Sequence, residues 1–200
     1  MEVFTPTDEQ HHVFCDVIDG GASALVTAGP GTGKSRTAIE CATRFIEKGE
    51  LTYPYQVLFL SFSNAAVRRL ARSAGIQFKR KQQRLLRFST YHALAAEVVS
   101  LYGRFVGLPR QVRVIDKLEE NLISIERGLP TGKQELLPAL LGLARSEGLL
   151  AFDVLIPLAV SLLSNSFTLR GIIGRRFPLI VVDEFQDTSQ AQWNFLKVLG

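Results

Sequence analysis

The sequence predicts an α/β fold: a mostly parallel sheet with helices on both faces and a small all-helical insert. Three observations predict it. Apolar runs of strand length alternate with helical patterns in the first part of the chain and again near its end. A glycine-rich loop leads directly into one of the expected helices. The middle of the chain shows helical periodicity and no clear strand run.

The composition indicates a folded protein with one sizeable core. The chain has 200 residues, of which 46% are hydrophobic and 21% are charged, which is ordinary for a globular protein. Its net charge of +4 suits a polyanionic partner such as nucleic acid. No apolar run approaches the ~18 residues of a membrane span, so we expect no membrane partner. Cys15 and Cys41 lie in helical patterns and indicate buried thiols in a reducing cytosol.

The elements of the first half follow from apolar periodicity and from breaks at glycine. Helices are expected over Thr7–Ile18, over 34–48 with Gly49 at the stop, and over Asn64–Ser73. Ser23–Thr27 is expected as a short strand that leads into the glycine-rich loop. Gln56–Ser61 is expected as a strand buried on both faces, because it is continuously apolar.

The second half predicts the insert and the return to the sheet. The insert's expected helices are Asp116–Arg127, Gln134–Ser146 and Asp153–Ser164. Leu179–Val182 is then expected as a strand and 187–199 as a helix, capped near Asp187 or Thr188. We therefore predict a discontinuous P-loop motor domain formed by residues 1–94 and 175–200, with residues 95–174 as the helical insert subdomain.

The glycine-rich loop has the composition and the context of a P-loop. It reads Ala28-Gly29-Pro30-Gly31-Thr32-Gly33-Lys34-Ser35, between an expected strand and an expected helix. Glycines let successive backbone N–H groups surround an anion, and the helix N-terminus adds a partial positive charge. Lys34 is expected to reach the β- and γ-phosphates, and the Ser35 hydroxyl to bind Mg²⁺. The alternative is a glycine-rich turn that caps a helix. The motif predicts a P-loop NTPase (RecA-like) fold.

The end of the later strand supplies the carboxylate that such a loop needs. Leu179–Val182 is followed by Asp183 and Glu184. We expect Asp183 to help hold Mg²⁺ and Glu184 to act as general base on the attacking water. The alternative is an acidic strand end that only solvates the loop.

With its continuation through Thr188, this segment resembles the UvrD/Rep/PcrA family of superfamily-one DNA helicases. The resemblance covers residues 4–94 and 178–199. It implies that ATP and Mg²⁺ are the cofactors, and that the catalytic residues are Glu184, Lys34, Asp183 and Gln186. It places the nucleotide at Gln10, Ala28, Gly29, Pro30, Gly31, Thr32, Gly33, Lys34, Ser35 and Arg36. In the family's Q motif the glutamine reads adenine; here Gln10 also completes a capping box with Thr7, and both roles can hold.

Two further segments resemble the family's motifs Ia and Ib, which contact single-stranded DNA. They are Ser61–Ala66, where Ala65 replaces the usual lysine, and Phe88–His92. The DNA-binding residues implied are Phe62, Ser63, Asn64, Thr90, Tyr91 and His92. For Phe62 and Tyr91 the alternative is a core aromatic. Between the motifs, residues 79–87 form a basic run, preceded by Arg68, Arg69 and Arg72; it is either a solvated face or a phosphate contact.

The resemblance also implies the wider function. The intact protein would be a cytoplasmic 3′-to-5′ helicase of repair or replication restart, acting on single-stranded DNA or 3′-tailed duplex. Motif III and the second motor domain are expected after Gly200, so we expect these 200 residues to bind Mg-ATP weakly and hydrolyse it very slowly. The alternatives are a stand-alone P-loop NTPase or kinase and a non-enzymatic nucleic-acid-binding module.

Overall fold

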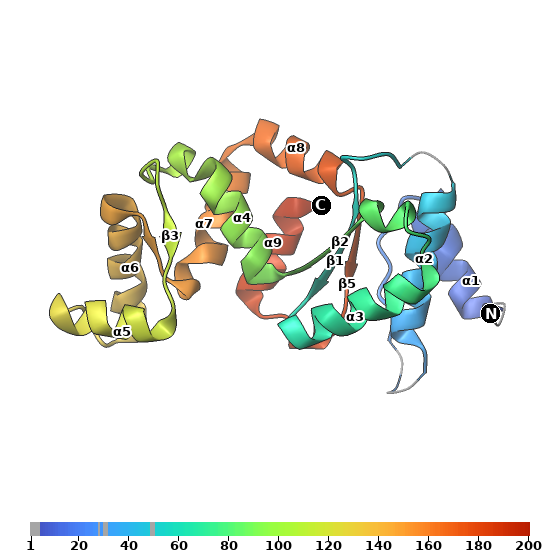
Figure 1. Ribbon diagram of the computed structural model, residues 1–200, viewed down its shortest axis with the longest axis horizontal. Coiled ribbons are helices and arrows are strands. Elements are labelled where there is room, and N and C mark those ends of the chain that lie inside the picture. Colours follow the sequence, from blue (N-terminus) through green and yellow to red (C-terminus); the bar gives the residue numbers. More distant parts are fainter. Residues whose placement is uncertain (1–4, 28, 30–31, 49–50) are drawn as a thin grey trace. The chain divides into compact units, whose positions relative to one another are not determined.

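The structure is a computed structural model of the chain, and it describes residues 5–27, 29, 32–48 and 51–200. The chain forms two compact units (Figure 1). The first comprises residues 1–60, 64–88 and 176–183, and the second residues 61–63, 89–175 and 184–200. The motor and insert boundaries at 94/95 and 174/175 stay predictions.

The first unit is built on a three-stranded sheet. Its strand order is β2-β1-β5, where β1 is Val57–Ser61, β2 is Leu86–Thr90 and β5 is Leu179–Val182. β1 and β5 are parallel, with Val57 opposite Leu179 and Leu60 opposite Val182. Every residue of β1 is buried, as expected for a continuous apolar run in the middle of a sheet. The predicted α/β fold with a parallel sheet is confirmed.

Helices of the first unit supply the rest of its core. They are α1 (Asp8–Phe14), continued by a π-helical turn over Cys15–Asp19, then α2 (Lys34–Glu47) and α3 (Asn64–Gln77), and a 3₁₀ turn covers Gln82–Leu85. All three predicted helices are confirmed, although α3 extends past Ser73. Residues of α2, α3, β1 and β2, with Phe78 directly after α3, form one hydrophobic cluster: Ile39, Ala42, Ile46, Val57, Phe59, Ala74, Phe78 and Leu86.

The predicted strand over Ser23–Thr27 is wrong. Residues 21–27 are irregular, and the side chains of Leu25 and Val26 are exposed. A strand forms only where a neighbour satisfies its backbone N–H and C=O groups. Within the described residues the sheet consists of β2, β1 and β5, and none of them pairs with this segment. Apolar composition therefore suggested a strand for which the described sheet offers no partner.

The second unit is mainly helical. Its core is α7 (Phe152–Asn165), which packs against α4 (Tyr91–Tyr102) and α9 (Gln190–Leu199). The remaining helices are α5 (Lys117–Glu126), α6 (Lys133–Glu147) and α8 (Phe167–Arg176), with a 3₁₀ turn over Gly103–Val106. The three helices predicted within the insert, now α5, α6 and α7, are confirmed, whereas α4, α8 and β2 were not predicted.

The insert departs in one respect from the all-helical prediction. β3 (Arg113–Val114) and β4 (Leu149–Leu150) form a short parallel pair. Gly148 makes the pairing possible: it ends α6 at φ 73°, and a Cβ there would lie 2.3 Å from the carbonyl oxygen of Gln111. Two-residue strands have no periodicity of their own, so a sequence pattern does not indicate them.

The last helix begins later in the sequence than predicted. α9 begins after Ser189, whose side chain forms a capping box with Gln192, and residues 185–187 form a 3₁₀ turn instead of the predicted helix start.

Among the described residues, no single helix is long and apolar enough to cross a membrane. α7 and α8 reach that length only together, and they are bent by 110° relative to each other.

Candidate functional site

The P-loop segment meets the first turn of α2 at a left-handed glycine. Gly33 has a φ of 89° and precedes the first helical residue, Lys34. The ammonium of Lys34 donates to the carbonyl oxygen of Gly29 at 2.9 Å, and the Thr32 hydroxyl donates to the same oxygen at 2.7 Å. Lys34, which the sequence assigned to phosphate, and Thr32, which the resemblance placed at the nucleotide, thus donate to one oxygen beside a helix N-terminus. A phosphate oxygen offers the same kind of acceptor with a full negative charge.

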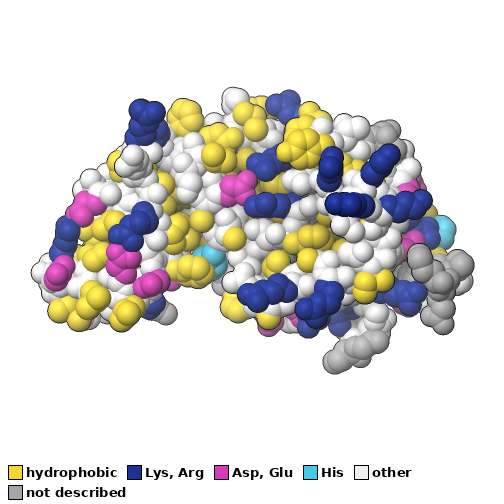
Figure 2. Space-filling model, in the orientation of Figure 1, with side chains coloured by type: hydrophobic (Ala, Val, Ile, Leu, Met, Phe, Trp, Pro, Cys, Tyr) yellow, Lys and Arg dark blue, Asp and Glu magenta, His cyan; other side chains and the backbone are white. Residues whose placement is uncertain are grey.

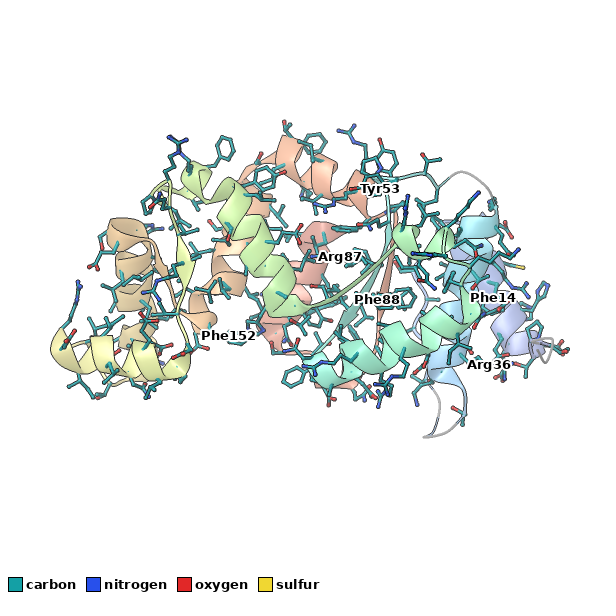
Figure 3. The ribbon with its side chains drawn as sticks, viewed as in Figure 1. Phe14, Arg36, Tyr53, Arg87, Phe88 and Phe152 are labelled. Carbon is teal, nitrogen blue, oxygen red and sulfur yellow. The ribbon has the colours of Figure 1, made fainter. Side chains whose placement is uncertain are left out.

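The remaining P-loop residues divide between described and undescribed positions. Ala28, Pro30 and Gly31 lie outside the described residues. Ser35 is half-buried in the first turn of α2. Arg36 extends from the same turn and is exposed (Figure 3). Their roles toward nucleotide and metal stay predictions.

Gln10 connects α1 to this turn: its side chain completes the predicted capping box and also bonds Thr37 of α2, a contact that the sequence did not predict. Its Oε1 accepts from the backbone N–H of Thr7 at 3.0 Å, which completes the predicted capping box. Its Nε2 donates to the Thr37 hydroxyl at 2.9 Å, and that hydroxyl lies 3.2 Å from the carbonyl oxygen of Gly33. Gln10 is therefore held two contacts away from the P-loop. Recognition of adenine by Gln10 stays a prediction.

Asp183 lies at the carboxyl end of β5, as predicted. Its backbone N–H donates to the carbonyl oxygen of Leu60 at 2.9 Å, which continues the β1–β5 ladder by one residue. Its side chain is 11% exposed, and Oδ2 lies 3.6 Å from Nη2 of Arg69 on α3. The sequence placed Arg69 only in a basic run, so its position beside the acidic strand end comes from the structure alone.

The oxygen ligands that Ser35 and Asp183 can offer are suited to magnesium that arrives with a nucleotide. Ser35 offers a hydroxyl and Asp183 a carboxylate, both of the hard oxygen type that Mg²⁺ prefers. The described residues contain no cluster of three or more His, Cys, Asp or Glu side chains that could hold a metal ion by themselves. Sites that use one carboxylate and one hydroxyl complete the octahedron with phosphate oxygens and waters. Bound Mg²⁺ would supply charge neutralisation at the phosphates.

Glu184, the predicted general base, has an unusual backbone. Its φ of 55° and ψ of 47° are left-handed, and it is the one non-glycine with positive φ among the described residues. Such a conformation costs about 1–2 kcal/mol for an L-residue and occurs often at functional sites. The Gln186 amide donates to the Glu184 carboxylate. The two predicted catalytic residues of this turn are therefore in direct contact.

The predicted DNA-contacting residues after β1 are accessible. Phe62 is 57% exposed, which leaves its ring available for stacking. Ser63 is half-buried, and Asn64 is exposed as the first residue of α3. Lys and Arg side chains gather over α3 (Figure 2), where Arg68, Arg69 and Arg72 are exposed.

The last residue of β2 and the residue that follows it have different environments. The Thr90 hydroxyl caps α4 by accepting from the backbone N–H of Ala93 at 3.2 Å. Tyr91 is only 1% exposed, and its hydroxyl lies 3.3 Å from that of Thr188. Of the two interpretations left open for Tyr91, this burial favours the core aromatic, and its assignment to DNA stays an untested prediction. Burial raises the pKa of the Tyr91 hydroxyl, and the contact with Thr188 opposes that shift.

His92 stacks on a residue that the sequence did not single out. Its ring lies 3.8 Å, centroid to centroid, from that of Phe152. Phe152 lies at the start of α7 (Figure 3). Burial lowers the pKa of His92, and the nearby Asp153 opposes that shift. His92 is therefore a neutral, oriented ring at physiological pH. Phe152 and Thr37 make contacts with residues far away in the sequence, and no local pattern indicates such contacts.

Comparison with known proteins agrees with this arrangement. The model of the UvrD/REP helicase N-terminal domain matches residues 8–144 and 132–200. A PcrA ATP-dependent DNA helicase from Leuconostoc citreum is 22% identical over 88% of this chain and 29% of its own length. Rep ATP-dependent DNA helicases from Salmonella typhimurium and Escherichia coli are each 25% identical over 88% of this chain and 32% of their own length.

The chain thus spans about a third of the length of these relatives. The matched residues include the P-loop, the acidic end of β5 and the segments after β1 and β2. The family model covers nearly the whole sequence, and the chain belongs to the UvrD/Rep helicase N-terminal domain family.

Proposed function

We propose that this chain is the ATP-binding part of a DNA helicase motor, in which hydrolysis drives movement along single-stranded DNA. The observation that carries the proposal is the convergence of Lys34 and Thr32 on one oxygen at the left-handed N-terminus of α2. In the bound state the β- and γ-phosphates of ATP take the place of the Gly29 carbonyl as their acceptor. The relatives' description as ATP-dependent DNA helicases supports ATP as the nucleotide and DNA as the track.

Each catalytic role has a residue in this proposal. Asp183 and Ser35 hold Mg²⁺, and Glu184, oriented by Gln186, accepts a proton from the attacking water. Gln10 contacts the adenine through its amide, which requires its bond to Thr37 to open or to be shared. Arg36 contacts the nucleotide from the first turn of α2.

The DNA side of the proposal uses groups that are exposed or half-buried. Phe62 stacks on a base, Ser63 and Asn64 bond the DNA backbone, and His92 with Thr90 contacts the strand further along. The basic side chains of α3 and of residues 79–87 contact phosphates. We propose 3′-to-5′ movement, a second motor domain as partner and a cytoplasmic location, to which the two free thiols Cys15 and Cys41 are suited.

The rate of hydrolysis is expected to be low for these 200 residues. Arginines that stabilise the developing phosphate charge raise phosphoryl-transfer rates about a thousandfold or more. In this family we place them in the two thirds of the relatives' length that the chain does not match. The 200-residue chain should therefore bind Mg-ATP with little turnover, even when DNA is added.

The test is ATP binding by the wild type and by Lys34→Ala. Loss of a charge-assisted bond to phosphate should weaken the binding of fluorescent mant-ATP about ten- to hundredfold in the presence of Mg²⁺. Lys81→Ala is the matched control, since Lys81 is an exposed lysine of the basic run and should leave nucleotide affinity unchanged. Equal ATP affinity of Lys34→Ala and the wild type would remove the P-loop from the function. Single-stranded DNA binding without any ATP affinity would favour a nucleic-acid-binding module instead.

A further inference from the structure

The three strands of the first unit's sheet begin at one edge, where Gln56 connects the segments that precede them. Its Nε2 donates to the carbonyl oxygen of Arg84 at 3.0 Å, and its backbone N–H donates to the carbonyl oxygen of Arg176 at 2.8 Å. Gln56 directly precedes β1, Arg84 shortly precedes β2, and Arg176 shortly precedes β5. These three segments therefore lie side by side, and we call this edge the amino edge of the sheet.

Exposed basic side chains gather at the amino edge. The 3₁₀ turn before β2 and the residues that lead into it carry Lys79, Arg80, Lys81 and Arg84, and all four are exposed. In Figure 2, Lys and Arg side chains gather over this turn as well as over α3. Residues 64–96 contain no Asp or Glu, so no carboxylate of this stretch offsets the positive charge. Such a surface attracts a polyanion, which releases counterions when it binds.

Two exposed tyrosines lie on the loop that precedes β1. Tyr53 is 74% exposed and Tyr55 is 43% exposed (Figure 3 labels Tyr53). The backbone N–H of Tyr55 donates to the carbonyl oxygen of Thr52 at 2.9 Å, so a turn holds the loop that carries both rings. Because Gln56 follows Tyr55 directly and bonds the backbone of Arg84, the tyrosines and the basic turn belong to one surface.

This combination of groups favours a single-stranded nucleic acid over other polyanions. In proteins that bind single strands, bases stack on aromatic rings while basic side chains contact the phosphates. An acidic protein segment would use the basic side chains alone and would give the exposed tyrosines no role.

We propose that the amino edge is a second contact surface for single-stranded DNA, formed by Tyr53 and Tyr55 with the basic side chains of residues 79–84. The inference rests on the proposed function for the identity of the strand as DNA. Asn64, a predicted DNA contact of the same unit, lies beyond the opposite end of β1. Five residues of strand span about 15 Å, so the amino edge binds nucleotides other than those at Asn64.

The test measures the affinity of the 200-residue chain for a long fluorescein-labelled oligothymidine strand by anisotropy. The double variant Tyr53→Ala, Tyr55→Ala should weaken binding about five- to hundredfold, as expected for the loss of base stacking. The double variant Lys79→Ala, Lys81→Ala should reduce the slope of log affinity against log salt by about 1.4, because each phosphate contact to a single strand contributes about 0.7. All four side chains are exposed, so neither variant should change the midpoint of thermal unfolding.

Two exposed residues of the second unit provide matched controls. Phe105→Ala removes an aromatic ring that is 81% exposed, and Arg145→Ala removes an exposed positive charge from α6. Both controls should keep the affinity and the salt dependence of the wild type.

The outcomes separate this inference from the function on which it rests. Unchanged affinity of the tyrosine variant would overturn the inference, and a reduced salt slope in the lysine variant would then indicate an acidic protein as the partner. If only Phe62→Ala loses affinity, the inference fails and the proposed function stands. If the tyrosine variant loses affinity and Phe62→Ala does not, the inference stands and Phe62 is removed from the proposed DNA contacts.

Discussion

The left-handed backbone of Glu184 leads to a stability prediction that inverts the usual order of alanine and glycine. At φ 55° an alanine has the same Cβ clash as glutamate, about 1–2 kcal/mol, whereas glycine has none. Against this, glycine gains about 0.4–1 kcal/mol of conformational freedom in the unfolded chain. Glu184→Gly should therefore be about 1 kcal/mol more stable than Glu184→Ala. Both variants lose the Gln186 contact, so that loss cancels.

The measurement is the midpoint of thermal unfolding for the two variants. A difference of ~1 kcal/mol corresponds to about 2–4 °C for a chain of this size. The matched control is the same pair of substitutions at Ser73, an exposed residue inside α3, where glycine should be about 0.5–1 kcal/mol less stable than alanine. Glu184→Ala equal to or more stable than Glu184→Gly would show that the left-handed turn carries no strain. Neither variant should hydrolyse ATP if Glu184 is the base.

Three further predictions concern two hydrogen-bond contacts and one buried thiol. Thr37→Val removes the hydroxyl that holds Gln10 and should lower the free energy of unfolding by about 1–2 kcal/mol in urea titrations. Tyr91→Phe should cost about 0.5–1 kcal/mol through its Thr188 contact and leave single-stranded DNA affinity unchanged in anisotropy titrations; a large loss of affinity would return Tyr91 to the DNA interface. Burial raises the pKa of Cys41 from 9.0 to about 11. Unfolding therefore favours the thiolate, so the free energy of unfolding should fall as pH rises from 9 toward 11, and Cys41→Ala should flatten that slope.

The fold was predictable wherever a local pattern was long enough. β1 was predictable from its continuous apolar run. α2 and the insert's three helices were predictable from the helical spacing of their apolar residues, and α1 from the capping box of Thr7 and Gln10. Failures came where local and tertiary requirements differ. Ser23–Thr27 has strand composition but pairs with none of the described strands, and β3 and β4 are two residues each and exist because Gly148 allows their close approach.

In the candidate site, too, some features were predictable from the sequence and others were not. The reactive groups that we propose, Lys34, Ser35, Asp183 and Glu184, were predicted from motif chemistry, because binding of phosphate and magnesium requires those residue types in that order. Their partners did not follow. Tyr91 matched a DNA motif and yet lies in the core of the second unit, and His92 has an aromatic partner 60 residues away in the sequence.

The sequence by itself determined the membership of this chain in a helicase family, and it predicted a loop that surrounds phosphate and an acidic strand end that holds magnesium. These properties depend only on residue types and on their spacing along the chain, and the sequence gives both directly. Only the tertiary structure decided that Arg69 faces Asp183, that Gln10 is held by Thr37, and that Glu184 is left-handed. Each of these features depends on how separate elements pack or on the path of the backbone. Ion pairs and side-chain hydrogen bonds form between groups that are close in space, and closeness in space does not follow from separation along the sequence.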